Sequence, residues 1–329
     1  MALLGIDIGG TKRVVVVGDH MGEPLAQIRK PMENSGDWRT DLAHLVADAR
    51  TLLADLEAST SETLTRIGVS VPGPADSRRG VLINPPNLAS WHHAPVGPAL
   101  EDAFGVEVRI ENDANAAALA EWGAGAGQGV RDMVYLTMST GVGGGIIADG
   151  KLLTGAFGAA GEVGHMPIEF PGIHCRCGLS GCLEAYVGGN AWRARLREVV
   201  PESSDALARA GGDREAVRPE HLVAAALAGD AFAREEFARW LDHLARGIVA
   251  LVMLLEPERI VLGTIATAAG EALCFEPLRE RVAAGLWEHQ SERLSIMPAS
   301  LGDDMPARAG LAVALAGTPM NTGLSSEIV

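Results

Sequence analysis

The sequence predicts an α/β protein built from two related domains whose similar loops face one cleft. Its length of 329 residues suggests two domains, at a typical domain size of about 150 residues. A short apolar run that ends in a glycine-rich turn occurs near the N-terminus and again about 130 residues later. Predicted helices lie between the strands of both halves, which indicates an α/β architecture.

The elements of the first half follow from their residue patterns. Residues 3–8 are an apolar run that ends at the turn Gly9-Gly10-Thr11, and the β-branched residues 14–17 favour a second strand. The turn at residues 19–22 leads to a third strand. Farther along, the sequence predicts a helix at 41–57, strands at 67–71 and 106–110, and a helix at 114–124 that Asn112-Asp113 would cap.

The second half repeats the opening pattern. Residues 133–138 are apolar, 139–145 are glycine-rich, Ile146-Ile147 is β-branched, and Asp149-Gly150 turns the chain. Apolar residues between Phe237 and Leu255 keep helical spacing on one face, which suits either the core or a dimer interface. The remaining predictions are a strand at 259–262, a terminal helix at 307–316 and a flexible surface segment at 201–218.

These elements suggest where the domains divide. We expect a smaller N-terminal domain at residues 1–112, completed by the C-terminal helix within about 305–329. A larger domain at 113–304 then contains the cysteine-rich loop 162–184.

Composition excludes several classes of function. The chain is 47% hydrophobic and 21% charged, so it can bury a large core, and its net charge is −15. This charge argues against binding nucleic acid or anionic membranes, and it requires any nucleotide site to supply its own positive potential. The longest apolar run, Ile248 to Leu255, is too short to span a membrane, and the start does not resemble a secretory signal. We therefore expect a cytoplasmic protein.

Two familiar nucleotide motifs do not apply. Residues 145–151 begin like a Walker loop, but Leu152 stands where Ser or Thr must hold Mg²⁺. The glycines of residues 141–145 are followed by β-branched residues instead of a helix, which disfavours a Rossmann dehydrogenase.

The remaining interpretation is a pair of hairpin loops at residues 7–12 and 137–145. Glycines allow backbone N–H groups to approach phosphate oxygens, and Thr11, Thr140 and Lys12 add donors. Asp7 could hold Mg²⁺ through water. Either loop alone could be only a tight turn, but finding both in equivalent places favours phosphate binding.

One imidazole and three thiols within 18 residues form a candidate metal site. His165, Cys175, Cys177 and Cys182 match the ligand set of a closed tetrahedral zinc centre, which would be structural because it leaves no position for water. His174 is an alternative to His165, and reduced thiols without metal are the simpler reading.

Carboxylates near this loop suggest sugar binding. Fixing the loop on zinc also fixes Glu162 and Glu184, and anchored carboxylates accept hydrogen bonds from neighbouring sugar hydroxyls. Asn112-Asp113 places a carboxylate at a helix start, where the dipole keeps Asp113 ionised and able to accept a proton. The simpler readings are solvated surface glutamates and a plain helix cap.

Taken together, the motifs resemble the ROK family (repressor, open reading frame, kinase), and most closely its bacterial glucokinases. They run in family order over most of the chain. The matching segments are Asp7 to Lys12, Val71 to Pro74, Pro86-Asn87-Leu88 with Trp91, Glu111 to Ala116, Ser139 to Gly145, Glu162 to His165 and Cys175 to Glu184.

The resemblance implies an actin-like, two-domain ATPase (ribonuclease H-like) fold that closes on sugar and ATP, usually in a homodimer or homotetramer. It implies that Asp113 is the catalytic base and that Gly263 lies near the adenosine. Phosphate-binding positions are implied for Gly9, Gly10, Thr11, Lys12, Thr140, Gly141, Gly143 and Gly144, and sugar-binding positions for Asn87, Asn112, Asp113, Glu162, His165 and Glu184.

The expected function is an ATP- and Mg²⁺-dependent hexose kinase with structural Zn²⁺ and with glucose as first substrate. Kinases for N-acetylmannosamine, N-acetylglucosamine or fructose share every motif. A sugar-responsive regulator without catalysis is the rival from another class, although family repressors carry a helix-turn-helix before the first loop and strand one begins here at about residue 3. The sequence departs from the family near the adenosine, where Leu262-Gly263-Thr264-Ile265 replaces a run of glycines that is common in the family and retains Gly263 alone.

Overall fold

The computed structural model describes residues 1–59 and 62–317, which form two compact units. Unit 1 comprises residues 1–129, 151–160 and the segment from 300 onward, and unit 2 comprises 130–150 and 161–299. Unit 1 thus extends past residue 112. The predicted division between domains at residues 112 and 113 stays a prediction. Of the C-terminal segment predicted to complete the first domain, at about 305–329, residues 318–329 lie outside the described residues.

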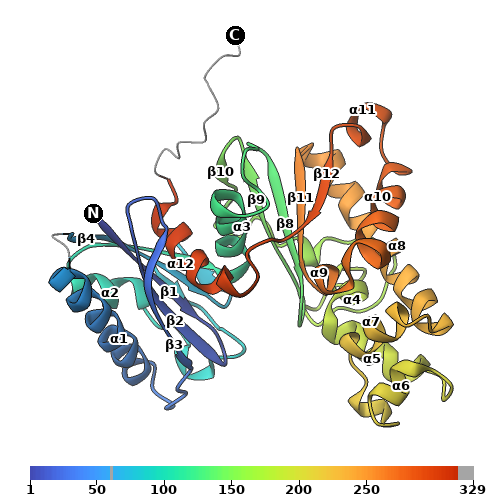
Figure 1. The fold of residues 1–329 in the computed structure, drawn as a ribbon, viewed down its shortest axis with the longest axis horizontal. Coiled ribbons are helices and arrows are strands. Elements are labelled where there is room, and N and C mark those ends of the chain that lie inside the picture. The colour runs from blue at the N-terminus through green and yellow to red at the C-terminus, as the bar shows by residue number, and fades with distance from the viewer. Residues whose placement is uncertain (60–61, 318–329) are drawn as a thin grey trace. The chain divides into compact units, whose positions relative to one another are not determined.

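Unit 1 is built on a five-stranded mixed sheet of order β3-β2-β1-β4-β7 (Figure 1). β1 and β2 form an antiparallel hairpin, β4 runs parallel to β1, and β7 runs parallel to β4. The strands are β1 (Ala2–Ile8), β2 (Lys12–Gly18), β3 (Pro24–Pro31), β4 (Leu64–Val71) and β7 (Glu107–Asn112), and a separate small pair is β5 (Ala75–Asp76) with β6 (Val81–Leu82).

Helices cover both faces of this sheet, which is why its central strands are almost continuously apolar. Leu4 and Ile6 belong to a core shared with the helices of one face, whereas Leu3 packs with α12 on the other face. The helices of unit 1 are α1 (Trp38–Ser59), α2 (Val96–Phe104), α3 (Asp113–Ala124) and α12 (Met305–Leu315), with short helices η1 (Ala89–Trp91) and η5 (Gly302–Asp304).

The C-terminal helix approaches the sheet unusually closely at glycines. A Cβ atom at Gly68 would lie 2.1 Å from the backbone nitrogen of Ala314, and one at Gly5 would lie 2.7 Å from that of Leu311. Side chains at these positions would therefore push α12 off the sheet.

A second five-stranded sheet, of order β10-β9-β8-β11-β12, repeats the sheet of unit 1, and all of its strands except β10 belong to unit 2. β8 and β9 form the antiparallel hairpin, β11 is parallel to β8, and β12 is parallel to β11. The predicted repeat and the two-domain α/β class are confirmed. The strands are β8 (Met133–Met138), β9 (Val142–Ala148), β10 (Lys151–Leu152), β11 (Arg259–Thr264) and β12 (Ser295–Pro298).

The long helix α8 supplies the core of unit 2. Its residues Phe237 and Trp240 are fully buried and pack against Trp192, with the two indole rings stacked at 5.5 Å between centroids. The core interpretation of this helix face is confirmed. The other helices are α4 (Glu184–Val187), α5 (Gly189–Val199), α6 (Asp205–Arg209), α7 (Pro219–Leu227), α8 (Ala231–Leu255), α9 (Ile265–Gly270), α10 (Glu276–Ala283) and α11 (Glu288–Ser291), with short turns η2 (Val163–His165), η3 (Arg214–Ala216) and η4 (Glu271–Phe275).

The segment at 201–218 differs from the prediction. It contains α6 and η3 and buries Ala206 and Leu207 in the core of unit 2. Ser204 begins α6 by accepting a hydrogen bond from the Ala206 N–H, which is a helix-start signal within a polar stretch.

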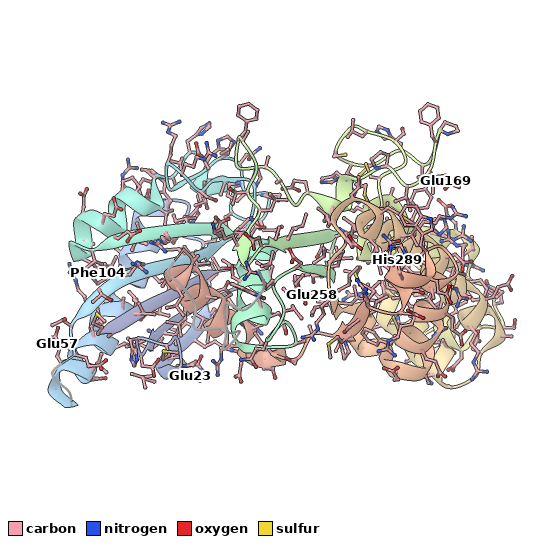
Figure 2. All side chains as sticks on the ribbon, turned by 90° about the horizontal axis from the view of Figure 1, so that it is seen from above. Glu23, Glu57, Phe104, Glu169, Glu258 and His289 are labelled. Atoms are coloured by element: carbon pink, nitrogen blue, oxygen red, sulfur yellow. The ribbon has the colours of Figure 1, made fainter. Side chains whose placement is uncertain are left out.

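Exposed acidic residues occur on both units, although Asp41, Asp48, Glu121 and Glu236 are buried. Glu23 and Glu57 in unit 1 and Glu169 and Glu258 in unit 2 are exposed (Figure 2). Among the described residues, no helix is long and apolar enough to cross a membrane.

Candidate functional site

The predicted residues of unit 1 gather where its parallel strands end. β1 leads into the first glycine turn, and β7 leads into α3 at Asp113. The sheet register places Asp7 opposite Ser70 and Ser70 opposite Glu111. Because the carboxyl ends of parallel strands meet at one edge of a sheet, this edge is where a ligand is expected in an open α/β fold.

Asp7 is partly buried at this edge, and its carboxylate accepts a hydrogen bond from the Ser70 hydroxyl at 2.7 Å. Burial raises the pKa of Asp7 from 3.8 to about 6, opposed by the Ser70 hydrogen bond and reinforced by the negative charge of Asp113. Sequence reasoning missed Ser70, although a serine inside an otherwise apolar strand is a visible signal.

This raised pKa predicts a pH-dependent stability. The folded state favours protonated Asp7, so stability present below pH 3.8 is lost as the pH rises to about 6. Asp7→Asn is expected to be more stable than the unchanged chain above pH 6, with the difference shrinking toward pH 4. Urea unfolding at pH 4.5 and pH 7.5 without nucleotide or metal checks this, and Ser70→Ala is the control, because it should weaken the fold at both pH values. A stability difference that is equal at both pH values would contradict the prediction.

The first glycine turn is tight and lies against Asn87. The Gly9 N–H donates to the Lys12 carbonyl at 2.9 Å, and β2 begins at Lys12, which is exposed together with Thr11. A Cβ at Gly10 would lie 2.8 Å from the Cβ of Asn87. The fold therefore brings the predicted phosphate turn and one predicted sugar residue together within unit 1.

Asn112 and Asp113 have different roles at the start of α3. Asn112 is the N-cap, because its side-chain oxygen accepts the Asn115 N–H at 2.8 Å. Asp113 is exposed and is the first residue of the helix, where the positive end of the helix dipole favours a carboxylate. Behind them, Glu111 accepts from the Asn115 side chain, and burial raises the pKa of Glu111. With Oδ1 used in the cap, the amide NH₂ is the donor that Asn112 can offer to a ligand.

The second glycine turn is held by α5. The carbonyl groups of Ser139 and Thr140 accept the N–H groups of Gly189 and Asn190, both at 2.9 Å. In a trans peptide the carbonyl and the next N–H point in opposite directions, so the N–H groups of Thr140 and Gly141 point away from α5. Successive backbone N–H groups in a turn are a general means of binding an anion.

Gly143 and Gly144 lie in β9 rather than in the turn. They pair with Thr137 and Leu136 of β8, so the strand begins earlier than predicted. Gly144 has a packing reason as well, because a Cβ there would lie 2.4 Å from the side chain of Val163. Their predicted contact with phosphate stays a prediction.

His165, Cys175, Cys177 and Cys182 come together as predicted. Their ligand atoms all lie within 4.8 Å of one another, with 3.7 Å between the sulfurs of Cys177 and Cys182 and 3.9 Å between Cys175 Sγ and His165 Nδ1. Zn–S bonds of about 2.3 Å in a tetrahedron separate two sulfurs by about 3.8 Å, whereas a disulfide requires about 2.05 Å. The cluster is consistent with a zinc site, and the imidazole in it is that of His165, whereas His174 is exposed and is not a member.

Local chain geometry makes this cluster possible. The Cys175 N–H donates to the Leu179 carbonyl at 2.7 Å, which closes a tight turn around the ligands. Gly178 and Gly181 have positive φ values of 94° and 80°, a conformation that favours glycine.

Glu184 joins the metal cluster to the second glycine turn. One carboxylate oxygen accepts the Val142 N–H at 2.9 Å, and the other lies 3.9 Å from Cys175 Sγ. A Cβ at Gly141 would lie 2.3 Å from this carboxylate, which explains why residue 141 is a glycine.

Glu162 is exposed immediately before η2. In η2 itself, a Cβ at Gly164 would lie 2.2 Å from the Val142 carbonyl oxygen. Both glutamates therefore belong to one packed region of unit 2.

A pocket of about 430 Å³ opens beside the second turn within unit 2. Thr264 lines this pocket, whereas the preceding residue, Gly263, is buried in β11, where a Cβ would lie 2.8 Å from the Tyr135 hydroxyl oxygen. Sequence reasoning did not single out the two arginines of this pocket: Arg193 lies on α5, which was not predicted, and Arg218 is the N-cap of α7, at the end of the segment predicted to be flexible. The lining includes Ser139, Thr140, Asn190, Arg193, Arg218 and Thr264.

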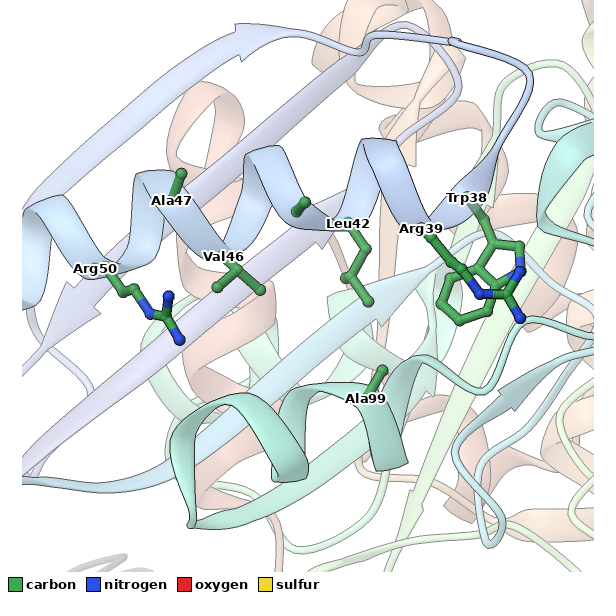
Figure 3. Close-up of a pocket in the computed structure, with 8 residues that line it drawn as sticks. Trp38, Arg39, Leu42, Val46, Ala47, Arg50 and Ala99 are labelled. Carbon is green, nitrogen blue, oxygen red and sulfur yellow. The ribbon is translucent and has the colours of Figure 1, made fainter.

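A larger pocket, of about 690 Å³, lies in unit 1 between α1 and α2. Figure 3 shows Leu42, Val46 and Ala99 between the two helices, with Arg39 and Arg50 on the helix beside them. Because it contains none of the residues that end the parallel strands, we do not place the candidate site there.

A family model described as "ROK family" matches residues 3–316. The chain belongs to the ROK family. It is 36% identical over 284 residues to a glucokinase of Thermotoga maritima, a match that covers 86% of this chain and 87% of that protein.

Other ROK relatives differ in activity. A xylose repressor of Caldicellulosiruptor bescii is 30% identical over 92% of this chain and 75% of the repressor. An N-acetylmannosamine kinase of Citrobacter koseri is 36% identical over 77% of this chain and 78% of the kinase. Similarity to single relatives therefore supports the family and leaves the substrate open.

Solved structures agree on the ROK fold. The ROK hexokinase of Thermus thermophilus has a TM-score of 0.80 at 33% identity and covers 95% of this chain and 97% of its own. A ROK glucokinase of Streptomyces griseus, solved in complex with glucose and AMPPNP, has a TM-score of 0.74 at 29% identity and covers 96% of this chain and 99% of its own. The expected two-domain ROK architecture is thus confirmed.

Proposed function

We propose that this ROK protein is an ATP- and Mg²⁺-dependent kinase that phosphorylates the C6 hydroxyl of a hexose, with glucose as first substrate. The start of α3 carries this proposal: Asn112 caps the helix, and the exposed Asp113 carboxylate follows as its first residue. Similarity to ROK glucokinases, one of which binds glucose and an ATP analogue, supports it.

In this proposal Asp113 is the general base. It accepts the proton of the C6 hydroxyl as the hydroxyl oxygen forms a bond to the γ-phosphorus, the bond from that phosphorus to the β-phosphate breaks, and ADP leaves. The positive end of the helix dipole favours a carboxylate at this position. Asn87 and Asn112 are assigned to the sugar, and both lie in unit 1.

Unit 2 supplies the other sugar residues and the donor turn. Glu162, His165 and Glu184 are assigned to sugar hydroxyls, where a carboxylate accepts hydrogen bonds. The N–H groups of Thr140 and Gly141 are assigned to phosphate. The first turn at Gly9 to Lys12 is also assigned to phosphate, where the Lys12 ammonium would add positive charge to an acidic chain.

Two metals complete the proposal. Mg²⁺ would be held near Asp7, whose carboxylate lies at the strand edge, and would neutralise phosphate charge. Zn²⁺ would be held by His165 and the three cysteines, and its closed shell would make it structural.

N-acetylmannosamine is the second candidate substrate, because the Citrobacter koseri kinase is as similar in identity as the Thermotoga maritima glucokinase. A regulator without catalysis is the alternative of another class, supported by the xylose repressor.

A coupled ADP-release assay tests these alternatives with purified protein, Mg²⁺ and ATP. Glucose, mannose, fructose, N-acetylglucosamine and N-acetylmannosamine are supplied separately, and we expect the highest kcat/KM with glucose. A higher value with N-acetylmannosamine would assign that substrate instead. Sugar binding by calorimetry without turnover of any sugar would reject the kinase and support the regulator.

A further inference from the structure

Thr264 has a backbone conformation that threonine rarely adopts. It is the last residue of β11, with φ of 55° and ψ of −108°. A β-branched residue at positive φ is strained, and such strain persists only where the surroundings hold it. Within the described ranges, the other non-glycine residues with positive φ are not β-branched; they are His93, Asp149 and Glu256.

The side chain of Thr264 explains how this conformation is held. Its hydroxyl donates a hydrogen bond to the Met138 carbonyl at the end of β8, and its oxygen lies 3.4 Å from the Thr137 hydroxyl oxygen. The strand register places Thr264 directly beside Met138. The side chain therefore ties the end of β11 to the residue that precedes the second glycine turn.

The Thr264 hydrogen bond is one of three that fix successive carbonyl groups of the turn. The carbonyls of Met138, Ser139 and Thr140 accept, in order, the Thr264 hydroxyl, the Gly189 N–H and the Asn190 N–H. Each carbonyl fixed in this way also fixes the direction of the next N–H. After Met138 this is the Ser139 N–H, which donates to the Gly141 carbonyl at 3.0 Å and closes the turn, so the N–H groups left to face a ligand are those of Thr140 and Gly141. Of the three donors, the Thr264 hydroxyl alone belongs to a side chain, so a single substitution can remove it.

Thr264 also lines the 430 Å³ pocket with Ser139 and Thr140. The volume is within the range of small-molecule sites, and Arg193 and Arg218 add positive charge to it. A nucleotide placed with its phosphates at the Thr140 turn would reach this pocket with its remaining part.

We propose that Thr264 is a positioning residue for the nucleotide: its hydroxyl, held by a strained backbone, orients the Met138–Thr140 turn that binds the donor phosphates. This inference rests on the proposed function, because it assigns the pocket to the donor. It predicts that Thr264 controls KM for ATP and leaves KM for the sugar unchanged.

Three substitutions test it. Thr264→Val keeps the β-branched shape and removes the hydroxyl, and it should raise KM for ATP about tenfold, because the Met138 carbonyl then lacks its partner. Thr264→Ser keeps the hydroxyl and should restore KM to within about twofold of the unchanged chain. Thr264→Gly removes the strain, so it should unfold at an equal or higher temperature and still bind ATP more weakly.

KM for ATP, KM for glucose and thermal unfolding are measured for each variant. Equal KM values for Val and Ser, or a parallel rise of both KM values in the Val and Gly variants, would overturn the inference. A Gly variant with unchanged ATP affinity would do the same.

Calorimetric binding of MgADP separates this inference from the proposed function, since it requires no sugar. Weaker MgADP binding by Thr264→Val supports the inference even in a chain that phosphorylates no hexose. Unchanged MgADP binding in an active kinase overturns the inference and leaves the proposed function standing. No MgADP binding by the unchanged chain overturns both.

Discussion

Asp113→Asn is expected to lower kcat for hexose phosphorylation by about 10³-fold, because the amide cannot accept the proton of the attacking hydroxyl. Sugar binding should change little, since asparagine keeps the size of the side chain and its ability to hydrogen-bond. The start of α3 should also remain folded, because its cap is the Asn112 side chain. Steady-state kinetics give kcat, and calorimetry without ATP gives the sugar affinity.

The matched control for this substitution is Asp102→Asn, which makes the same chemical change at an exposed position of α2. The control should retain normal kcat. If Asp113→Asn also turns over near the normal rate, the assignment of the general base is wrong.

Cys177→Ser is expected to release zinc, lower the unfolding temperature and weaken sugar binding by about 10- to 100-fold. The sulfur of Cys177 belongs to the four-ligand cluster, and the residue is exposed, so the change creates no core cavity. Zinc content by atomic absorption, thermal unfolding and sugar calorimetry check the three parts.

The loop offers a close control in His174→Ala, because His174 is exposed and lies outside the cluster. This variant should keep its zinc and its sugar affinity. Unchanged sugar affinity in metal-free Cys177→Ser would contradict the idea that the cluster fixes Glu162 and Glu184. Less than about half an equivalent of zinc in the unchanged chain, purified without chelator, would reject the metal site itself.

The sequence carried enough information for the repeated sheets and the metal cluster. Alternating or continuous apolar runs marked the central strands, and the glycine turns marked where they end. The three cysteines and His165 could be grouped because metal-ligand spacing is local in sequence.

What the sequence could not give depends on contacts distant along the chain. The hydrogen bond from Ser70 to Asp7 joins two strands 63 positions apart, and that from Thr264 to Met138 joins two that are 126 apart. The helices α5 and α7 were not predicted, although apolar residues of α5 keep helical spacing at Trp192, Leu196 and Val199. The buried faces of both helices pack in the core of unit 2. Strand boundaries such as Gly143 were misplaced because glycine-rich sequence resembles a turn even where it pairs with a neighbour.

The packing of α12 on Gly5 and Gly68 also bears on how the protein is made. During synthesis Leu3 and Val16 leave the ribosome well before Leu311, which covers them. The first sheet therefore keeps one apolar face exposed to solvent until α12 has been synthesised. The residues of unit 2 can fold around their own core before that point. A chain truncated before residue 305 should accordingly aggregate through this exposed apolar face. It would still contain every residue that is assigned to the reaction.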